Sequence, residues 1–202
     1  MKADERISYR HESKSSDHGP QQRNSTRKRK GLGKDFNIGT WNVRSLKKIG
    51  KIEELKIALK NYKMEITALQ ELKMQGKGIE KHNKDQLDLY FSCRDKTSPF
   101  GCGFAIRGPM RDKVIGWYPF NERMCSIRIK GIFNNYSFIC VHAPTDVEKD
   151  PEAKDAFYDE LDRVYESCPN YDTKIILGDL NAQIDCEKVY EGTIVALPSL
   201  VA

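Results

Sequence analysis

The chain has 202 residues, of which 39% are hydrophobic and 31% are charged, and its formal net charge is +5. This length accommodates one sizeable domain, and no stretch reaches the ~18 consecutive apolar residues that a membrane-spanning helix requires. The N-terminus also lacks the apolar segment of a secretory signal peptide. We therefore expect an intracellular protein, nuclear or cytoplasmic, with no membrane partner.

The first 34 residues contain few large apolar side chains and include the basic run RKRK at 27–30. Such a segment cannot bury enough apolar surface to offset the entropy lost on ordering, so we predict a disordered basic tail over residues 1–34. The basic run is compatible with nuclear import or nucleic-acid contact, and equally with a solvated tail.

From residue 35 onward, short apolar runs alternate with turns. The segment 36–41 alternates as a strand does. An amphipathic helix is predicted next from an apolar stripe at helical spacing, formed by Ile49, Ile52, Leu55, Leu59 and Tyr62. Further strands are predicted at 65–70, 87–92, 101–106, 113–118, 124–129 and 136–141. Because no helical pattern separates the last four, we expect them to form antiparallel hairpins.

A second helical stripe, made of Ala153, Phe157, Leu161 and Val164, is stopped before Pro169. The run at 174–177 then returns to strand. The order of elements predicts an α+β architecture in which helices cover layered sheets.

The six cysteines show no C-x-x-C spacing and mostly lie inside apolar runs. This pattern favours buried, reduced thiols over a disulfide framework or a zinc site. The six are Cys93, Cys102, Cys125, Cys140, Cys168 and Cys186.

Four predicted strands end on polar groups: Asn42, Glu71, His142, and the pair Asp179 and Asn181. Each group alone has an ordinary explanation, namely a turn residue, the start of a solvated loop, a hydrogen-bonded core histidine and an Asx-type turn. Their joint occurrence at strand ends favours a functional site.

Residues two apart in an extended chain point the same way. Asp179 and Asn181 could therefore face one site together, and so could Asn42 and Arg44.

The segments GTWNVRSL, LQE, VHAPT and LGDLNAQI, in this order, resemble the motifs of the endonuclease/exonuclease/phosphatase superfamily, which includes DNase I and the apurinic/apyrimidinic endonucleases. The sequences of these motifs most resemble those in the endonuclease domains of non-long-terminal-repeat retrotransposons of the RTE class and in the derived craniofacial development protein 2 family. The resemblance implies a four-layered α/β/β/α sandwich of the DNase I-like type over residues 35–195. It also implies cleavage of phosphodiesters in DNA with Mg²⁺ or Mn²⁺.

The resemblance further implies a role for each polar residue. Glu71 would be the principal metal ligand, assisted by Asn42. Asp179 would orient or deprotonate the attacking water, Asn181 would help hold the water and the phosphate, and His142 would lie beside the scissile group. These residue types suit Mg²⁺, which prefers oxygen ligands and keeps several waters.

The sequence departs from the family pattern in two ways. Arg44 stands where the family often has an aspartate, although arginine is familiar in the retrotransposon branch and could contact phosphate or DNA. No counterpart of the family's closing Ser-Asp-His or Ile-Asp-His motif follows Asn181, and the segment ALPSLVA at 196–202 is unassigned. We therefore expect a fold that is incomplete at the C-terminus and an activity that is weak or absent. The alternative is a non-catalytic remnant or a nucleic-acid-binding protein.

Overall fold

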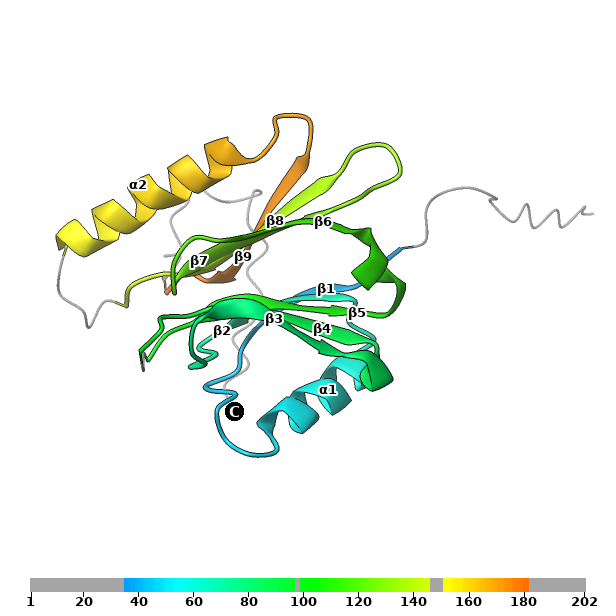
Figure 1. Ribbon diagram of the computed structural model, residues 1–202. Coiled ribbons are helices and arrows are strands. Elements are labelled where there is room, and N and C mark those ends of the chain that lie inside the picture. The colour runs from blue at the N-terminus through cyan, green and yellow to red at the C-terminus, as the bar shows by residue number, and fades with distance from the viewer. Residues whose placement is uncertain (1–34, 97–98, 146–150, 182–202) are drawn as a thin grey trace, which may run out of the picture. The chain divides into compact units, whose positions relative to one another are not determined.

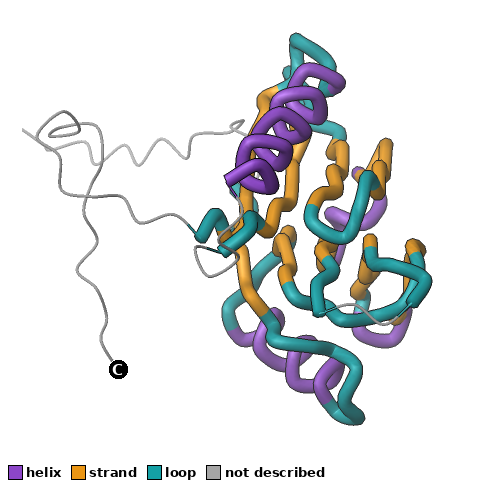
Figure 2. Tube along the Cα trace, turned by 90° about the vertical axis from the view of Figure 1, so that its left-hand side faces the viewer, coloured by secondary structure: helices purple, strands orange, loops and turns teal. Residues whose placement is uncertain are grey.

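The computed structural model describes residues 35–96, 99–145 and 151–181, which belong to one compact unit of the chain. Two β-sheets pack face to face, and one helix covers the outer side of each sheet (Figure 1). Figure 2 shows the same arrangement from the side, with the strands between the two helices. The predicted tails at 1–34 and 196–202, and residues 182–195 of the predicted domain, lie outside the described residues. The predicted four-layered α/β/β/α sandwich is confirmed.

Within the described ranges, the first sheet has five strands, and its only parallel pair is β1 (Ile38–Asn42) and β2 (Ile66–Gln70). In spatial order the strands are β1, β2, β5 (Cys102–Arg107), β4 (Leu87–Ser92) and β3 (Lys77–His82). Helix α1 (Lys51–Asn61) connects β1 to β2, as a parallel connection requires.

The second sheet also contains one parallel pair, formed by the last two strands in its spatial order. It contains β6 (Val114–Pro119), β7 (Met124–Ile129), β8 (Tyr136–His142) and β9 (Thr173–Asp179), in that order. Helix α2 (Pro151–Ser167) connects the parallel strands β8 and β9. Each sheet therefore carries one β-α-β unit whose two parallel strands end at the same edge. Neither helix in the described part of the chain is long and apolar enough to cross a membrane.

Every predicted strand is present, with its ends shifted by no more than a few residues, but two expectations were wrong. The first concerns β5 and β6, which do not form a hairpin. A 3₁₀-helix (Gly108–Lys113) carries the chain from one sheet to the other, whereas β6, β7 and β8 do form antiparallel hairpins. The second concerns the first helical stripe, because Ile49 and Tyr62 lie outside α1 and are exposed.

Strand β3 was not predicted, and its sequence shows why. The segment KGIEKH contains one large apolar side chain among a glycine and charged or polar residues. It pairs only with β4, at the edge of the sheet, so its residues alternate between exposed and half-buried positions. Charged residues are common on such edge strands because they discourage pairing with other chains.

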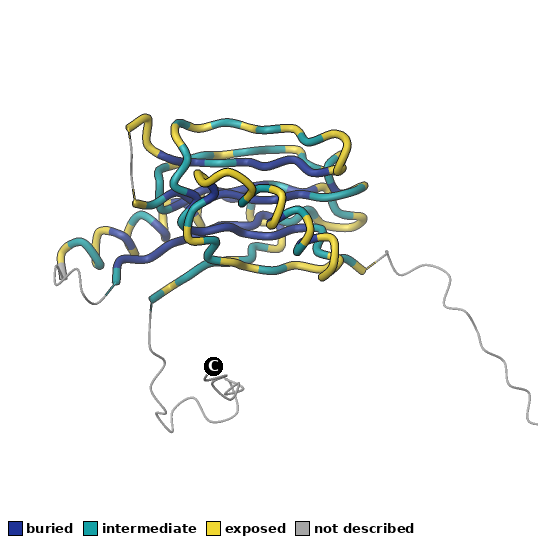
Figure 3. Tube along the Cα trace, turned by 90° about the horizontal axis from the view of Figure 1, so that it is seen from below, coloured by how far each residue is buried: buried dark blue, intermediate teal, exposed yellow. Residues whose placement is uncertain are grey.

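The apolar side chains fill three layers. The central layer lies between the sheets and includes Phe104, Ile127 and Phe138, all fully buried. Leu55 and Leu59 of α1 pack on the outer face of the first sheet, in the second layer. The third layer lies under α2 and is formed with Phe157, Leu161 and Val164. Figure 3 shows that the buried residues lie mainly in the middle strands. Burying each such side chain stabilises the fold by about 1.5–3 kcal/mol.

Candidate active site

Three of the predicted site residues meet at one end of the two sheets. Asn42 ends β1, Glu71 directly follows β2, and Asp179 ends β9 in the other sheet. The side-chain amide nitrogen of Asn42 donates a hydrogen bond to Oε1 of Glu71 at 2.8 Å. It also donates to Oδ2 of Asp179 at 3.4 Å. One amide group therefore joins two carboxylates that come from different sheets.

The two β-α-β units explain this convergence. Asn42 lies opposite Gln70 in the parallel β1–β2 pair, so Glu71 is the first residue beyond the same edge. His142 lies opposite Asp179 in the parallel β8–β9 pair. Because β1 and β9 contact each other across the layers, the carboxyl ends of all four strands come together. In open α/β sheets, the carboxyl ends of the parallel strands are also where ligands bind.

Glu71 is held in its ionised form. Its side chain is 24% exposed, and Oε2 lies 3.0 Å from the Lys73 ammonium group. Partial burial acts to raise the pKa of Glu71, but the hydrogen bond from Asn42 and the charge and hydrogen bond of Lys73 outweigh it, so the pKa is lowered. Glu71 and Lys73 both have left-handed backbone conformations, with φ of 56° and 54°. Such conformations concentrate at functional sites in non-glycine residues.

Asp179 is oriented by the chain that follows it. The backbone N–H of Asn181 donates to Oδ1 of Asp179 at 3.1 Å, which is an Asx-type turn. The Asn181 side-chain amide donates to the carbonyl of Ala143 at 2.7 Å and so ties the exits of β9 and β8 together. The ordinary explanation of this segment, a turn, is thus correct for one oxygen of Asp179. The other oxygen still faces Asn42.

His142 lies next to these carboxylates but is buried, with 5% of its surface exposed. Its ring packs edge-on against Phe100, with 5.8 Å between ring centroids. Burial lowers the pKa of His142, and the nearby Arg123 charge lowers it further, while Asp179 and Glu71 act in the opposite direction. The imidazole is therefore neutral at pH 7. Among the residues that the structure describes, none makes a hydrogen bond with its buried Nδ1, so His142 does not match the fully hydrogen-bonded core histidine that was the alternative.

Arg44 is exposed beside the site, and its backbone N–H donates to Oδ1 of Asn42 at 3.1 Å. The extended conformation that was expected to align Arg44 with Asn42 ends at Asn42, and Arg44 has a φ of 50°. The same correction applies to Asn181, whose φ is 47°. Both pairs are joined by local turns, because the chain leaves each strand directly after its functional residue.

Sequence reasoning missed three residues at this end of the sheets: Lys73, Phe100 and Arg123. The Arg123 guanidinium lies 3.9 Å from the Phe100 ring centre, and its Nη1 donates to the His142 carbonyl at 3.2 Å. Lys73 stands two positions after Glu71, which is the one signal that could have drawn attention to it. Nothing local distinguishes the other two, because they reach His142 from loops that are distant in the sequence.

A family model described as Endonuclease/Exonuclease/phosphatase family matches residues 39–188. Craniofacial development protein 2 of Bos taurus is 31% identical over 155 residues, which are 77% of this chain and 26% of that protein. The protein of the same name from Tragulus javanicus is 30% identical over the same shares. The chain thus spans about a quarter of the length of the curated relatives it matches.

Solved structures show the same fold at lower sequence identity. The endonuclease domain of TRAS1, a telomere-specific non-LTR retrotransposon, aligns with a TM-score of 0.52 and 16% identity, over 73% of this chain and 61% of that one. An AP endonuclease from Archaeoglobus fulgidus aligns with a TM-score of 0.51 and 19% identity, over 73% and 58% of the two chains. The chain belongs to the endonuclease/exonuclease/phosphatase family, and its described residues form a nuclease-like domain.

Proposed function

We propose that this domain is a divalent-metal-dependent phosphodiester hydrolase that acts on DNA, and that it derives from a retrotransposon endonuclease. The observation that carries the proposal is the meeting of Glu71 and Asp179 across the Asn42 amide at the ends of three strands. Family membership supports the reaction class. The similarity to the TRAS1 endonuclease domain supports the substrate class and the origin.

The residues at this end of the sheets fit Mg²⁺ or Mn²⁺. Such ions prefer oxygen ligands and keep several waters, so one carboxylate and one amide oxygen suffice as protein ligands. Glu71 would be the principal ligand, and Asn42 would assist once its amide turned to present Oδ1, which now accepts a hydrogen bond from the Arg44 N–H. The carboxylates of Glu71 and Asp179 both accept hydrogen bonds from the Asn42 amide, so they already converge on a group with positive partial charge. When bound, the ion would stabilise the negative charge that develops on the phosphate and on the leaving oxygen.

The hydrogen bonds of the other residues support the roles that we propose for them. The Asn181 N–H fixes Oδ1 of Asp179, so this carboxylate is positioned to orient a water or to accept its proton. Asn181 would also help to hold that water and the phosphate. His142 would place a neutral ring beside the scissile group.

We propose that the activity is weak. In the described ranges, His142 is the only imidazole at this end of the sheets, because His82 pairs with Leu87 at the opposite end. A neutral His142 supplies no positive charge to the transition state, and such charge-stabilising groups commonly contribute about 10²–10³-fold in rate. The segment after Asn181, where no closing Ser-Asp-His or Ile-Asp-His motif was found, lies outside the described ranges.

Exposed basic residues beside the site are suited to hold the DNA backbone. The loop between β1 and α1 carries Arg44, Lys47 and Lys48, and all three are exposed. Each phosphate contact that such residues make adds to the salt dependence of binding, by about 0.9 in the slope of log K against log salt for duplex DNA. Replacing all three by glutamine should therefore weaken DNA binding and flatten its salt dependence.

The test of activity is nicking of a supercoiled plasmid over several hours with Mg²⁺, with Mn²⁺ and with a chelator. We expect slow, metal-dependent nicking that falls about 10²-fold or more in Glu71→Gln and in Asp179→Asn. The matched control is Glu54→Gln, because Glu54 pairs only with Lys51 on the surface of α1. Equal nicking by the wild type and Glu71→Gln would contradict the proposal.

Metal binding is measured separately by thermal unfolding. A rise in Tm with Mn²⁺ in the wild type, absent in Glu71→Gln, would show that the ion binds at this site even if turnover is slow. DNA binding is measured by a filter-binding assay at several salt concentrations. Salt-dependent DNA binding without cleavage and without a Mn²⁺ shift would support the alternative, a nucleic-acid-binding protein.

A further inference from the structure

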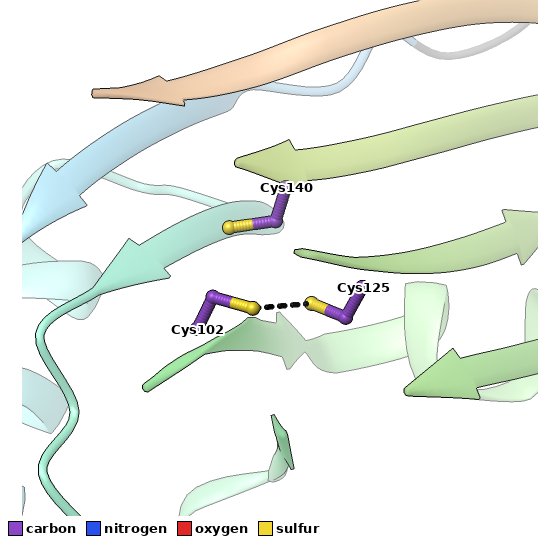
Figure 4. Close-up of side chains that lie close together, drawn as sticks. All are labelled: Cys102, Cys125 and Cys140. Carbon is purple, nitrogen blue, oxygen red and sulfur yellow. Dashed lines mark hydrogen bonds between the residues drawn. The ribbon is translucent and has the colours of Figure 1, made fainter. Parts of the chain in front are cut away.

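Three cysteine thiols meet in the central layer between the sheets. Cys102 lies on β5 of the first sheet, and Cys125 and Cys140 lie opposite each other on β7 and β8 of the second (Figure 4). All three residues are fully buried. Their sulfur atoms lie within 4.8 Å of one another, and the Sγ atoms of Cys102 and Cys125 are 3.4 Å apart.

These separations are close to those of a three-sulfur metal centre. A metal–sulfur bond is about 2.3 Å long, so three sulfurs around an ion in one plane lie about 4 Å from each other. Sulfurs that are 3.4–4.8 Å apart reach this arrangement by small side-chain rotations. The ligands come from three different strands, two of them in one sheet and one in the other, so the backbone already holds them in place.

A polar group is directed at the cluster from the first sheet. The Gln70 side chain is 1% exposed, and its amide nitrogen donates to Sγ of Cys140 at 3.3 Å. The Thr40 hydroxyl donates to Oε1 of Gln70 at 3.2 Å and fixes the orientation of this amide. A buried amide that donates to sulfur stabilises a thiolate, the form in which cysteine binds metals.

We propose that Cys102, Cys125 and Cys140 form a binding site for one Cu(I) ion. Soft thiolate ligands select Cu(I), and this cluster supplies three of them. Zinc fits less well because it takes four ligands, and in the described residues no fourth histidine, cysteine or carboxylate joins the group. Each ligating thiol forms a copper–sulfur bond and releases its proton to the solvent. Copper enters and remains as Cu(I), so no electron is transferred.

The test uses the full chain, purified without oxygen and equilibrated with Cu(I) in the presence of a chromophoric Cu(I) chelator. We expect the wild type to take one Cu(I) per chain from the chelator. Cys102→Ala, Cys125→Ala and Cys140→Ala should each weaken the affinity about 100-fold or more. Circular dichroism of each variant confirms that it is folded before its affinity is compared.

The matched controls are Cys93→Ala and Cys168→Ala. Both thiols are buried and free, but they lie in the other two apolar layers, under α1 and α2. We expect both controls to bind Cu(I) as the wild type does. No copper on the wild type, or an equal loss of affinity in the controls, would overturn the proposal.

A mass measurement distinguishes copper binding from oxidation. If the chain lost two hydrogens between Cys102 and Cys125 and bound no copper, the pair would be a disulfide-forming site and the Cu(I) proposal would be wrong. Neither result bears on the nuclease proposal, which is tested through Glu71 and Asp179.

Discussion

Asn42→Asp is the substitution that most directly tests how the site is built. The wild-type amide nitrogen lies 2.8 Å from Oε1 of Glu71 and 3.4 Å from Oδ2 of Asp179. A carboxylate oxygen in the same place replaces two attractive contacts by two repulsive ones. Glu71 is partly exposed, so a water-like dielectric is the appropriate lower limit for this repulsion.

The magnitude follows from these distances. Two unit charges at 2.8 and 3.4 Å repel by about 1.5 and about 1.2 kcal/mol in water. Losing the two hydrogen bonds costs about 1 kcal/mol more in total, since one of them is long. Rotation of the new side chain relieves part of the repulsion. We expect Asn42→Asp to be destabilised by about 3 kcal/mol without metal, and Asn42→Ala by about 1 kcal/mol.

Urea unfolding, with and without Mn²⁺, measures both variants. Three carboxylates attract a divalent cation more strongly than two, so Mn²⁺ should restore more stability to Asn42→Asp than to the wild type or to Asn42→Ala. Adding Glu71→Gln to Asn42→Asp should remove part of the repulsion and most of the response to Mn²⁺. If Asn42→Asp and Asn42→Ala were equally stable without metal, or if Mn²⁺ stabilised both equally, the described geometry would be wrong.

Three further predictions concern stability. The side chain of Asp172 is fully buried and accepts hydrogen bonds from Arg128 at 2.7 and 2.9 Å. Asp172→Asn should therefore lower the free energy of unfolding, measured in urea, by about 3–5 kcal/mol. The surface substitution Glu54→Gln should lower it by less than about 0.5 kcal/mol, and equal losses would contradict this prediction. Phe138→Ala removes a fully buried ring and should cost about 3–5 kcal/mol, and a loss below about 1 kcal/mol would show that the central layer is loosely packed. The lowered pKa of His142 means that the unfolded chain takes up a proton near the ordinary value of about 6.5, before the folded chain does. The wild type should therefore lose stability relative to His142→Gln as the pH falls below about 6.5, and parallel stability curves would show that the ring is not buried in its neutral form.

The sequence determined the elements whose side chains are buried in a regular pattern. Strand β2 could be predicted because all five of its residues are buried, and α2 because its buried residues recur at helical spacing. The polar residues Asn42, Glu71 and Asp179 could be identified because each ends an apolar run. These are local signals, since a side chain's preference for the core is expressed wherever it stands in the chain.

Only the tertiary structure decided how these elements meet. Strand β3 exists because β4 offers it a partner, and the chain passes between the sheets after β5 because a 3₁₀-helix turns it there. The bridge from Asn42 to Asp179 and the meeting of Cys102 with Cys140 depend on the order of strands in two sheets and on the way these sheets pack. Contacts between residues far apart in the chain are set by this packing, which no local pattern of residues encodes.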